Sequence, residues 1–145
     1  MIAGVRGAGA RGQDGAMNAI PEGYEELLLQ PNFGHLATVR PDGDPAVTPM
    51  WFEWDGELLR FTHTTRRAKL RNIEHNPHVA VSVLDAAKPY QYLQARCVLE
   101  SVTPDPTGAF YVKLAERYGM ENPAPPPDSA DRVIIAVRPF AYSKQ

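Results

Sequence analysis

The chain has 145 residues, of which 43% are hydrophobic and 22% are charged, a composition typical of a single globular domain. Its formal net charge of −2 argues against general binding to nucleic acid or to an anionic membrane. The single cysteine, Cys97, excludes an internal disulfide framework and a zinc site built from several cysteines. The four histidines show no HxxxH spacing, so we do not expect a metal site.

The first residues of the chain differ in composition from the rest. Residues 1–16 are rich in glycine and alanine, lack periodicity and contain no apolar run long enough for a signal peptide. We therefore expect a disordered N-terminal extension, followed by one domain over residues 17–145. No later segment is long and apolar enough to cross a membrane, so we expect a cytoplasmic protein.

The domain is expected to begin with a helix and a β-hairpin. A short amphipathic helix is predicted over residues 21–31, where the proline at each end sets its limits. Strands are predicted over residues 33–40 and 46–54, and Pro-Asp-Gly-Asp at 41–44 forms the turn between them. Pro49 lies inside the second strand and indicates an edge, a bulge or a backbone that faces a ligand.

A second hairpin and a helix follow. Asp55-Gly56 is typical of a tight turn and precedes a strand over residues 57–63. The predicted helix over residues 65–76 ends before Pro77, because proline disfavours helical geometry in the residue before it.

This helix opens with an unusual cluster of positive charge, formed by Arg66, Arg67, Lys69 and Arg71. A helix N-terminus already presents unpaired N–H groups and the positive end of a dipole, so basic side chains there are unfavourable without an anion. A bound phosphate would offset this cost. The alternative is a solvated basic face in which Thr65 only caps the helix, and the spacing alone does not separate the two interpretations.

The rest of the chain supplies more strands. We expect strands over residues 78–85, 90–102 and 132–140, a helix over 107–120 and a proline-rich loop over 121–131. About six strands joined mainly by hairpins, with two or three helices, favour a mainly β fold closed into a barrel.

Two stretches of the chain carry a resemblance to a known family. They are LATVRPDGDPAVTPMWFEWDGELLRFTHTTRRAKLRNIEHNPHVAVSVLD at 36–85 and YLQARCVLESV at 92–102. Over residues 22–142 the chain resembles the split β-barrel superfamily of pyridoxamine 5'-phosphate oxidase-like proteins, and most closely its branch of coenzyme F420-dependent reductases. The resemblance implies an FMN-binding-like split β-barrel. Members usually have a glycine near the position of Cys97, which is most simply a small buried side chain here.

The resemblance also implies which residues hold the cofactor. Those implied for its phosphate and acidic tail are Thr62, His63, Thr64, Arg67 and Lys69. Those implied beside its ring are Thr48, Pro49, Met50 and Trp51. A guanidinium fork and a lysine charge suit phosphate oxygens, and the apolar side chains suit a ring. Tyr90 and Tyr92 are implied to complete the site from a second subunit.

We therefore expect an oxidoreductase that passes a hydride from reduced coenzyme F420 to a small organic acceptor. Such an enzyme needs no nucleophile or metal of its own. The proton that follows the hydride could come from His63, a tyrosine or solvent. An FMN-dependent oxidoreductase on the same fold, or a protein that binds flavin or deazaflavin without turnover, remains an alternative.

A homodimer with cofactor sites at the interface is also expected. The strands at 78–85 and 132–140 carry apolar residues on both faces, more than one small barrel would bury. Aromatic residues of a kind enriched at interfaces add to this surface: Trp51, Phe52, Trp54, Tyr90 and Tyr92.

Overall fold

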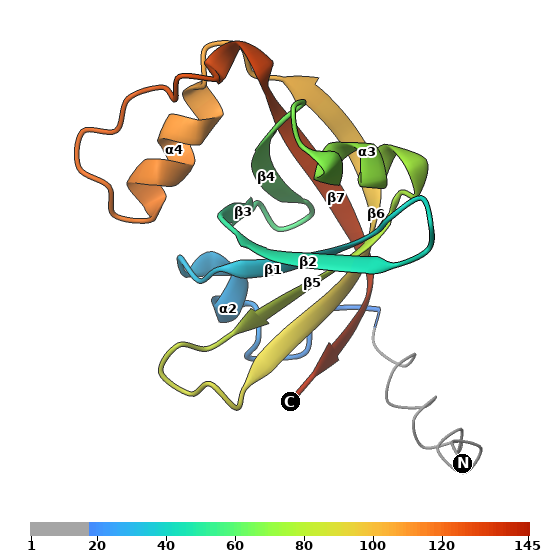
Figure 1. Cartoon of the computed structure of the whole chain (residues 1–145). Helices are drawn as coiled ribbons and strands as arrows, with labels where there is room; N and C mark the ends of the chain where they lie inside the picture. The colour runs from blue at the N-terminus through green and yellow to red at the C-terminus, as the bar shows by residue number, and fades with distance from the viewer. Residues whose placement is uncertain (1–17) are drawn as a thin grey trace.

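The computed structural model describes residues 18–145, so the extension predicted for residues 1–16 lies outside the described part (Figure 1). The strands are β1 (Gly34–Val39), β2 (Pro45–Met50), β3 (Phe52–Trp54), β4 (Leu59–Thr64), β5 (His78–Leu84), β6 (Tyr92–Pro104) and β7 (Arg132–Lys144). The helices are α2 (Glu26–Leu29), α3 (Ala68–His75), α4 (Ala109–Arg117) and the 3-10 helix η2 (Ser129–Asp131).

All seven strands form one antiparallel sheet in the order β2-β1-β5-β6-β7-β4-β3. The two edge strands, β2 and β3, are separated in the chain by Trp51 alone. Because consecutive Cα atoms lie only about 3.8 Å apart, the sheet must curl until its two edges are neighbours. Figure 1 shows this curled sheet, and the prediction of a mainly β, split β-barrel fold is confirmed.

Close packing at the meeting point of the edges requires a glycine in β1. A Cβ atom on Gly34 would lie 3.0 Å from Cδ1 of Phe52 and 3.3 Å from Cγ1 of Val81. Phe52 begins β3 and is fully buried, so its ring packs directly against the β1 backbone. Burial of such a ring contributes roughly 1.5–3 kcal/mol to stability. The chain is therefore fixed just after Trp51 by the packing of Phe52 in the core.

The strand predicted over residues 46–54 is two strands. The chain leaves the pairing with β1 after Met50 and enters the pairing with β4 at Phe52, so seven strands are present where about six were expected. Pro49 of β2 pairs with His35 of β1. Because β2 is an edge strand, no further strand lies on its side away from β1, and the missing N–H of Pro49 costs no sheet hydrogen bond on that side.

Each helix is shorter than its predicted range, for local reasons. Gly23 has a φ of 84°, which separates the turn after Pro21 from the four-residue helix α2. Gly108 has a φ of 71° and adopts a left-handed conformation, so α4 cannot begin before Ala109.

The core lies inside the curled sheet, because alternate residues of each strand face inward. In β5, Val79, Val81 and Val83 are buried while the residues between them are half-buried, so only one face of this strand packs fully within a single chain. Phe52 and Trp54 are buried in this core, and the expectation that they add to an interface surface is wrong.

Candidate functional site

A polar pocket of about 210 Å³ opens where β2, β4, β7 and the start of α3 meet. Its lining consists of Thr48, Pro49, Met50, Thr62, His63, Thr64, Arg67, Lys69 and Arg132. Eight of the nine residues predicted for one subunit's cofactor site are among them. The ninth, Trp51, lines an adjoining pocket. The structure thus gathers two separate stretches of sequence, 48–51 and 62–69, around one depression.

The end of β4 contributes three consecutive residues to the pocket, because both faces of the strand are covered there. Thr62, His63 and Thr64 are all buried. Arg67, with an extended backbone, occupies the N-cap position, and no side chain caps the helix. The interpretation of Thr65 as the cap is therefore wrong, and the helix N-terminus faces the pocket without a capping acceptor.

His63 has the most unusual electrostatic surroundings in this pocket. The residue is 6% exposed, and Nε2 has no hydrogen-bond partner among the described residues. Burial, followed by the positive charges of Lys69, Arg67 and Arg132, lowers the pKa of His63 to about 4. The imidazole is therefore neutral at pH 7, and its unpartnered nitrogen can bond a polar ligand atom.

Lys69 experiences the same field. Burial, and then the charge of Arg67, lowers the pKa of the Lys69 ammonium below its ordinary value. Within residues 18–145 neither Lys69 nor Arg67 forms an ion pair with a carboxylate. The pocket therefore carries positive charge that the described part of the chain does not neutralise, which favours an anionic ligand.

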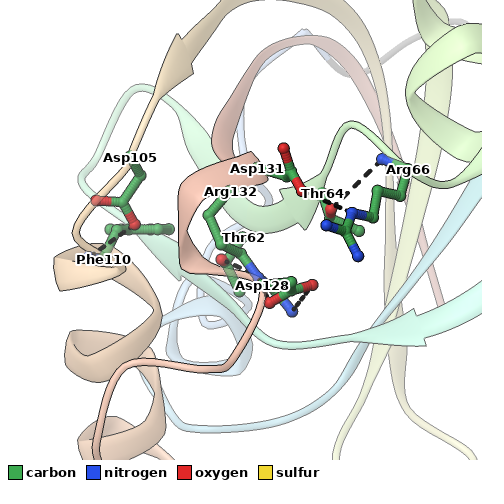
Figure 2. Close-up of polar contacts among 8 residues, drawn as sticks. All are labelled: Thr62, Thr64, Arg66, Asp105, Phe110, Asp128, Asp131 and Arg132. Carbon is green, nitrogen blue, oxygen red and sulfur yellow. Dashed lines mark hydrogen bonds and ion pairs between the residues drawn. The ribbon is translucent and has the colours of Figure 1, made fainter.

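Sequence reasoning missed Arg132, the third cation of this pocket. It is the first residue of β7, and the pairing of β4 with β7 sets it opposite Thr64. Figure 2 shows it beside Thr62, next to the segment of Asp128 and Asp131. No local signal marks this arginine, because its place depends on the pairing of strands almost 70 residues apart in sequence.

A second, apolar pocket of about 320 Å³ adjoins the first, with which it shares Pro49, Met50 and Thr62. Its other lining residues are Phe33 and Trp51. The Trp51 and Phe33 rings both stack on Tyr118, with centroid distances of 5.3 Å and 5.8 Å. A flat apolar group therefore fits beside a polar, cationic depression.

Helix α4 fixes this aromatic wall through its last turn. Arg117 Nε donates to the Phe52 carbonyl oxygen at 2.9 Å, and Arg117 Nη2 donates to that of Gln30 at 2.7 Å. The Tyr118 hydroxyl accepts from the Phe52 N–H at 3.1 Å and donates to the Asn32 carbonyl oxygen at 2.7 Å. Phe33 and Tyr118 are further site residues that sequence reasoning did not assign.

Tyr90 and Tyr92 do not join either pocket of this chain. Tyr92 begins β6, whose other end pairs with the start of β7 near the polar pocket. Tyr90, which is 66% exposed, lies in the connection from β5 to β6, and Figure 1 places this connection opposite α3. Their role toward a second subunit stays a prediction.

Cys97 is fully buried in β6, and burial raises the pKa of its thiol to about 12. In residues 18–145 no group of three His, Cys, Asp or Glu side chains is placed to hold a metal ion. No helix in this part of the chain has the length and hydropathy needed to span a membrane.

Comparison with known proteins agrees with this architecture. The family model described as pyridoxamine 5'-phosphate oxidase matches residues 20–145. A solved structure named F420 reductase shares 63% sequence identity over 87% of this chain and 100% of its own, with a TM-score of 0.84. No curated protein sequence matches the chain.

Two more distant structures share the fold alone. General stress protein 26 from Bacillus anthracis is 21% identical over 82% of this chain and 88% of its own, with a TM-score of 0.61. A conserved hypothetical protein from Mycobacterium tuberculosis is 23% identical over 89% of this chain and 86% of its own, with a TM-score of 0.65.

Proposed function

Since the chain belongs to the pyridoxamine 5'-phosphate oxidase family, in its branch of F420 reductases, we propose that it uses coenzyme F420 to reduce a small organic acceptor. The observation that carries this proposal is the pair of adjoining pockets, one cationic and one aromatic, in a chain 63% identical to a protein named F420 reductase. A phosphorylated deazaflavin has an anionic part, which suits the cationic pocket, and a flat ring, which suits the adjoining aromatic pocket.

The described residues fit such a cofactor. Among residues 18–145, Arg67 and Lys69 have no carboxylate partner, and the buried Nε2 of His63 has no hydrogen-bond partner. We assign the phosphate to these three groups and to Thr62 and Thr64, which line the same depression. Thr48, Pro49, Met50 and Trp51 would flank the ring.

When bound, the cofactor would supply the hydride for the acceptor. The chain itself would bind the cofactor, orient the acceptor beside it and exclude water from the apolar pocket. His63 is neutral at pH 7 because its pKa is about 4, so it hydrogen-bonds but is a poor proton donor at that pH. A tyrosine or solvent is the better source of the proton that follows the hydride.

The assignment is tested by titrating the protein with coenzyme F420 and, side by side, with FMN. Arg67→Ala and Lys69→Ala should each weaken F420 binding by about ten- to a hundredfold, the loss of one charge-assisted hydrogen bond. Arg71→Ala is the matched control, because Arg71 is exposed on the same helix and does not line the pocket.

Equal F420 affinity in all three folded variants would contradict the cofactor site. Tighter binding of FMN than of F420 would favour the FMN-dependent alternative. Reduction of a panel of acceptors by reduced cofactor separates an enzyme from a protein that only binds.

We also propose a homodimer in solution. Several large apolar side chains remain exposed on a single chain. They are Val47 of β2, Leu84 of β5, Phe140 of β7, and Tyr90 in the connection from β5 to β6. A two-fold interface would bury such surfaces reciprocally. Light scattering at micromolar concentration should give twice the mass of the 16.0 kDa chain, and a monomer that binds cofactor at full affinity would contradict this.

A further inference from the structure

Arg132 is pre-oriented at the junction of the two pockets. Its side chain is only 15% exposed, although it lines the polar pocket. Arg132 Nη1 lies 3.5 Å from Thr62 Oγ1, a long and weak hydrogen bond. Thr62 lines both pockets, so this edge of the guanidinium faces the place where they join.

The opposite edge of the guanidinium is held by a carboxylate. Arg132 Nε donates to Asp128 Oδ1 at 3.1 Å, and Nη2 donates to Oδ2 at 3.3 Å. The Tyr111 ring supports the flat face of the group at 5.1 Å. Figure 2 shows Asp128 and Arg132 facing each other beside Thr62. Together with the weak bond from Nη1 to Thr62, this arrangement uses three of the five N–H donors and leaves one donor on Nη1 and one on Nη2 for a ligand.

The segment that carries Asp128 is itself fixed to the pocket wall. Arg66 Nε donates to Asp131 Oδ2 at 2.6 Å, and the Thr65 N–H donates to the Asp131 carbonyl oxygen at 3.0 Å. Asp128 therefore holds Arg132 from a backbone that is tied to the start of α3. Its hydrogen bond from Arg132 lowers the pKa of Asp128, so the carboxylate stays charged near neutral pH.

We propose that Arg132 is a third anion-binding residue of this pocket, with Asp128 as the positioning residue that sets its guanidinium. The ligand group is a phosphate, bound together with Arg67 and Lys69. The inference rests on the proposed function only for the identity of the cofactor that carries this phosphate. A fork that is already ordered loses little conformational entropy on binding, and this is the advantage that Asp128 gives.

The first test is Arg132→Gln, titrated with F420, FMN and inorganic phosphate. We expect affinity for F420 and FMN to fall by about ten- to a hundredfold, with a flatter dependence on ionic strength. Arg138→Gln is the matched control, since Arg138 lies on the same strand and pairs with Glu57 and Glu100 away from the pocket. Urea denaturation confirms that each variant is folded. Arg132→Lys keeps the charge without the fork and should recover only part of the affinity.

The second test asks whether Asp128 acts through Arg132. Asp128→Asn should weaken cofactor binding by about three- to tenfold in the wild-type chain. In the Arg132→Gln chain the same change should not weaken binding, because no guanidinium remains to be held. A merely structural effect of Asp128 would weaken binding equally in both backgrounds, and that result would overturn the positioning role.

The outcomes separate this inference from the proposed function. If F420 binds equally to Arg132→Gln and wild type while Arg67→Ala weakens it, Arg132 is not part of the site and the proposed function stands. If only FMN binds, and Arg132→Gln weakens it, the inference stands and the F420 assignment fails.

Discussion

The free energy of unfolding of the ligand-free protein should decrease between pH 7 and pH 5, and replacing His63 with phenylalanine should abolish most of this decrease. The ring is buried beside three cations, and this holds the pKa of His63 at about 4, below the ordinary 6.5. The unfolded chain therefore binds a proton at His63 in the range between these two values, whereas the folded chain does not. Since protonation favours the unfolded state, stability is fully present above pH 6.5 and declines as the pH falls toward 4.

The size of the effect follows from the two pKa values. The difference between 6.5 and about 4 corresponds to about 3 kcal/mol in total. Between pH 7 and pH 5 the expected loss is about 2 kcal/mol. The aspartates whose pKa is lowered, Asp55 and Asp128, lose their charge only below this window and do not confuse the measurement.

The assay is urea denaturation of wild type, His63→Phe and His75→Gln at pH 7, 6 and 5. Phenylalanine fills a similar volume and cannot take up a proton, so its stability should change by only a small amount over this range. His75 is exposed on α3, and its replacement should leave the pH dependence as in wild type. Parallel curves for wild type and His63→Phe would refute the reasoning, because His63 would then titrate alike in both states.

Three further predictions concern the fold around the site. Arg117→Met should destabilise the protein by about 3 kcal/mol in urea denaturation, since several carbonyl groups lose a charged donor. Lys113→Met removes an ion pair whose lysine is 66% exposed and should cost less than about 1 kcal/mol, and equal costs would argue against this role of Arg117. Tyr118→Phe should cost about 1–3 kcal/mol by leaving the Phe52 N–H without an acceptor, and an unchanged urea midpoint would contradict this. The buried Cys97 thiol should resist an aromatic disulfide reagent at pH 8 in the native protein and react on unfolding; rapid native reaction would show that the strand opens.

Much of the local structure could be predicted because it depends on neighbouring residues. The turns at 41–44 and 55–56 and the proline after the basic helix locate the hairpins and the end of α3 in the right places. The stretches 48–51 and 62–69 each lie within one contiguous segment, so local motifs and the family resemblance identify them together. The predicted first residues of the helices are less accurate. Backbone conformations such as that of Gly108 prevent a helix from starting where the spacing of apolar residues would allow it.

Residue patterns along the chain were enough to predict most of the strands, the local basic cluster and the family resemblance. The change of sheet edge at Trp51, the position of Arg132 at the pocket and the support of the aromatic wall by Tyr118 become visible only in the folded chain. The same holds for the neutral state of His63, because it depends on burial and on three cations from two segments, the start of α3 and β7. The physical reason is the same in each case. Propensity, turn chemistry and periodicity act over a few residues, whereas strand pairing and electrostatic fields act between segments that only the curled sheet brings together.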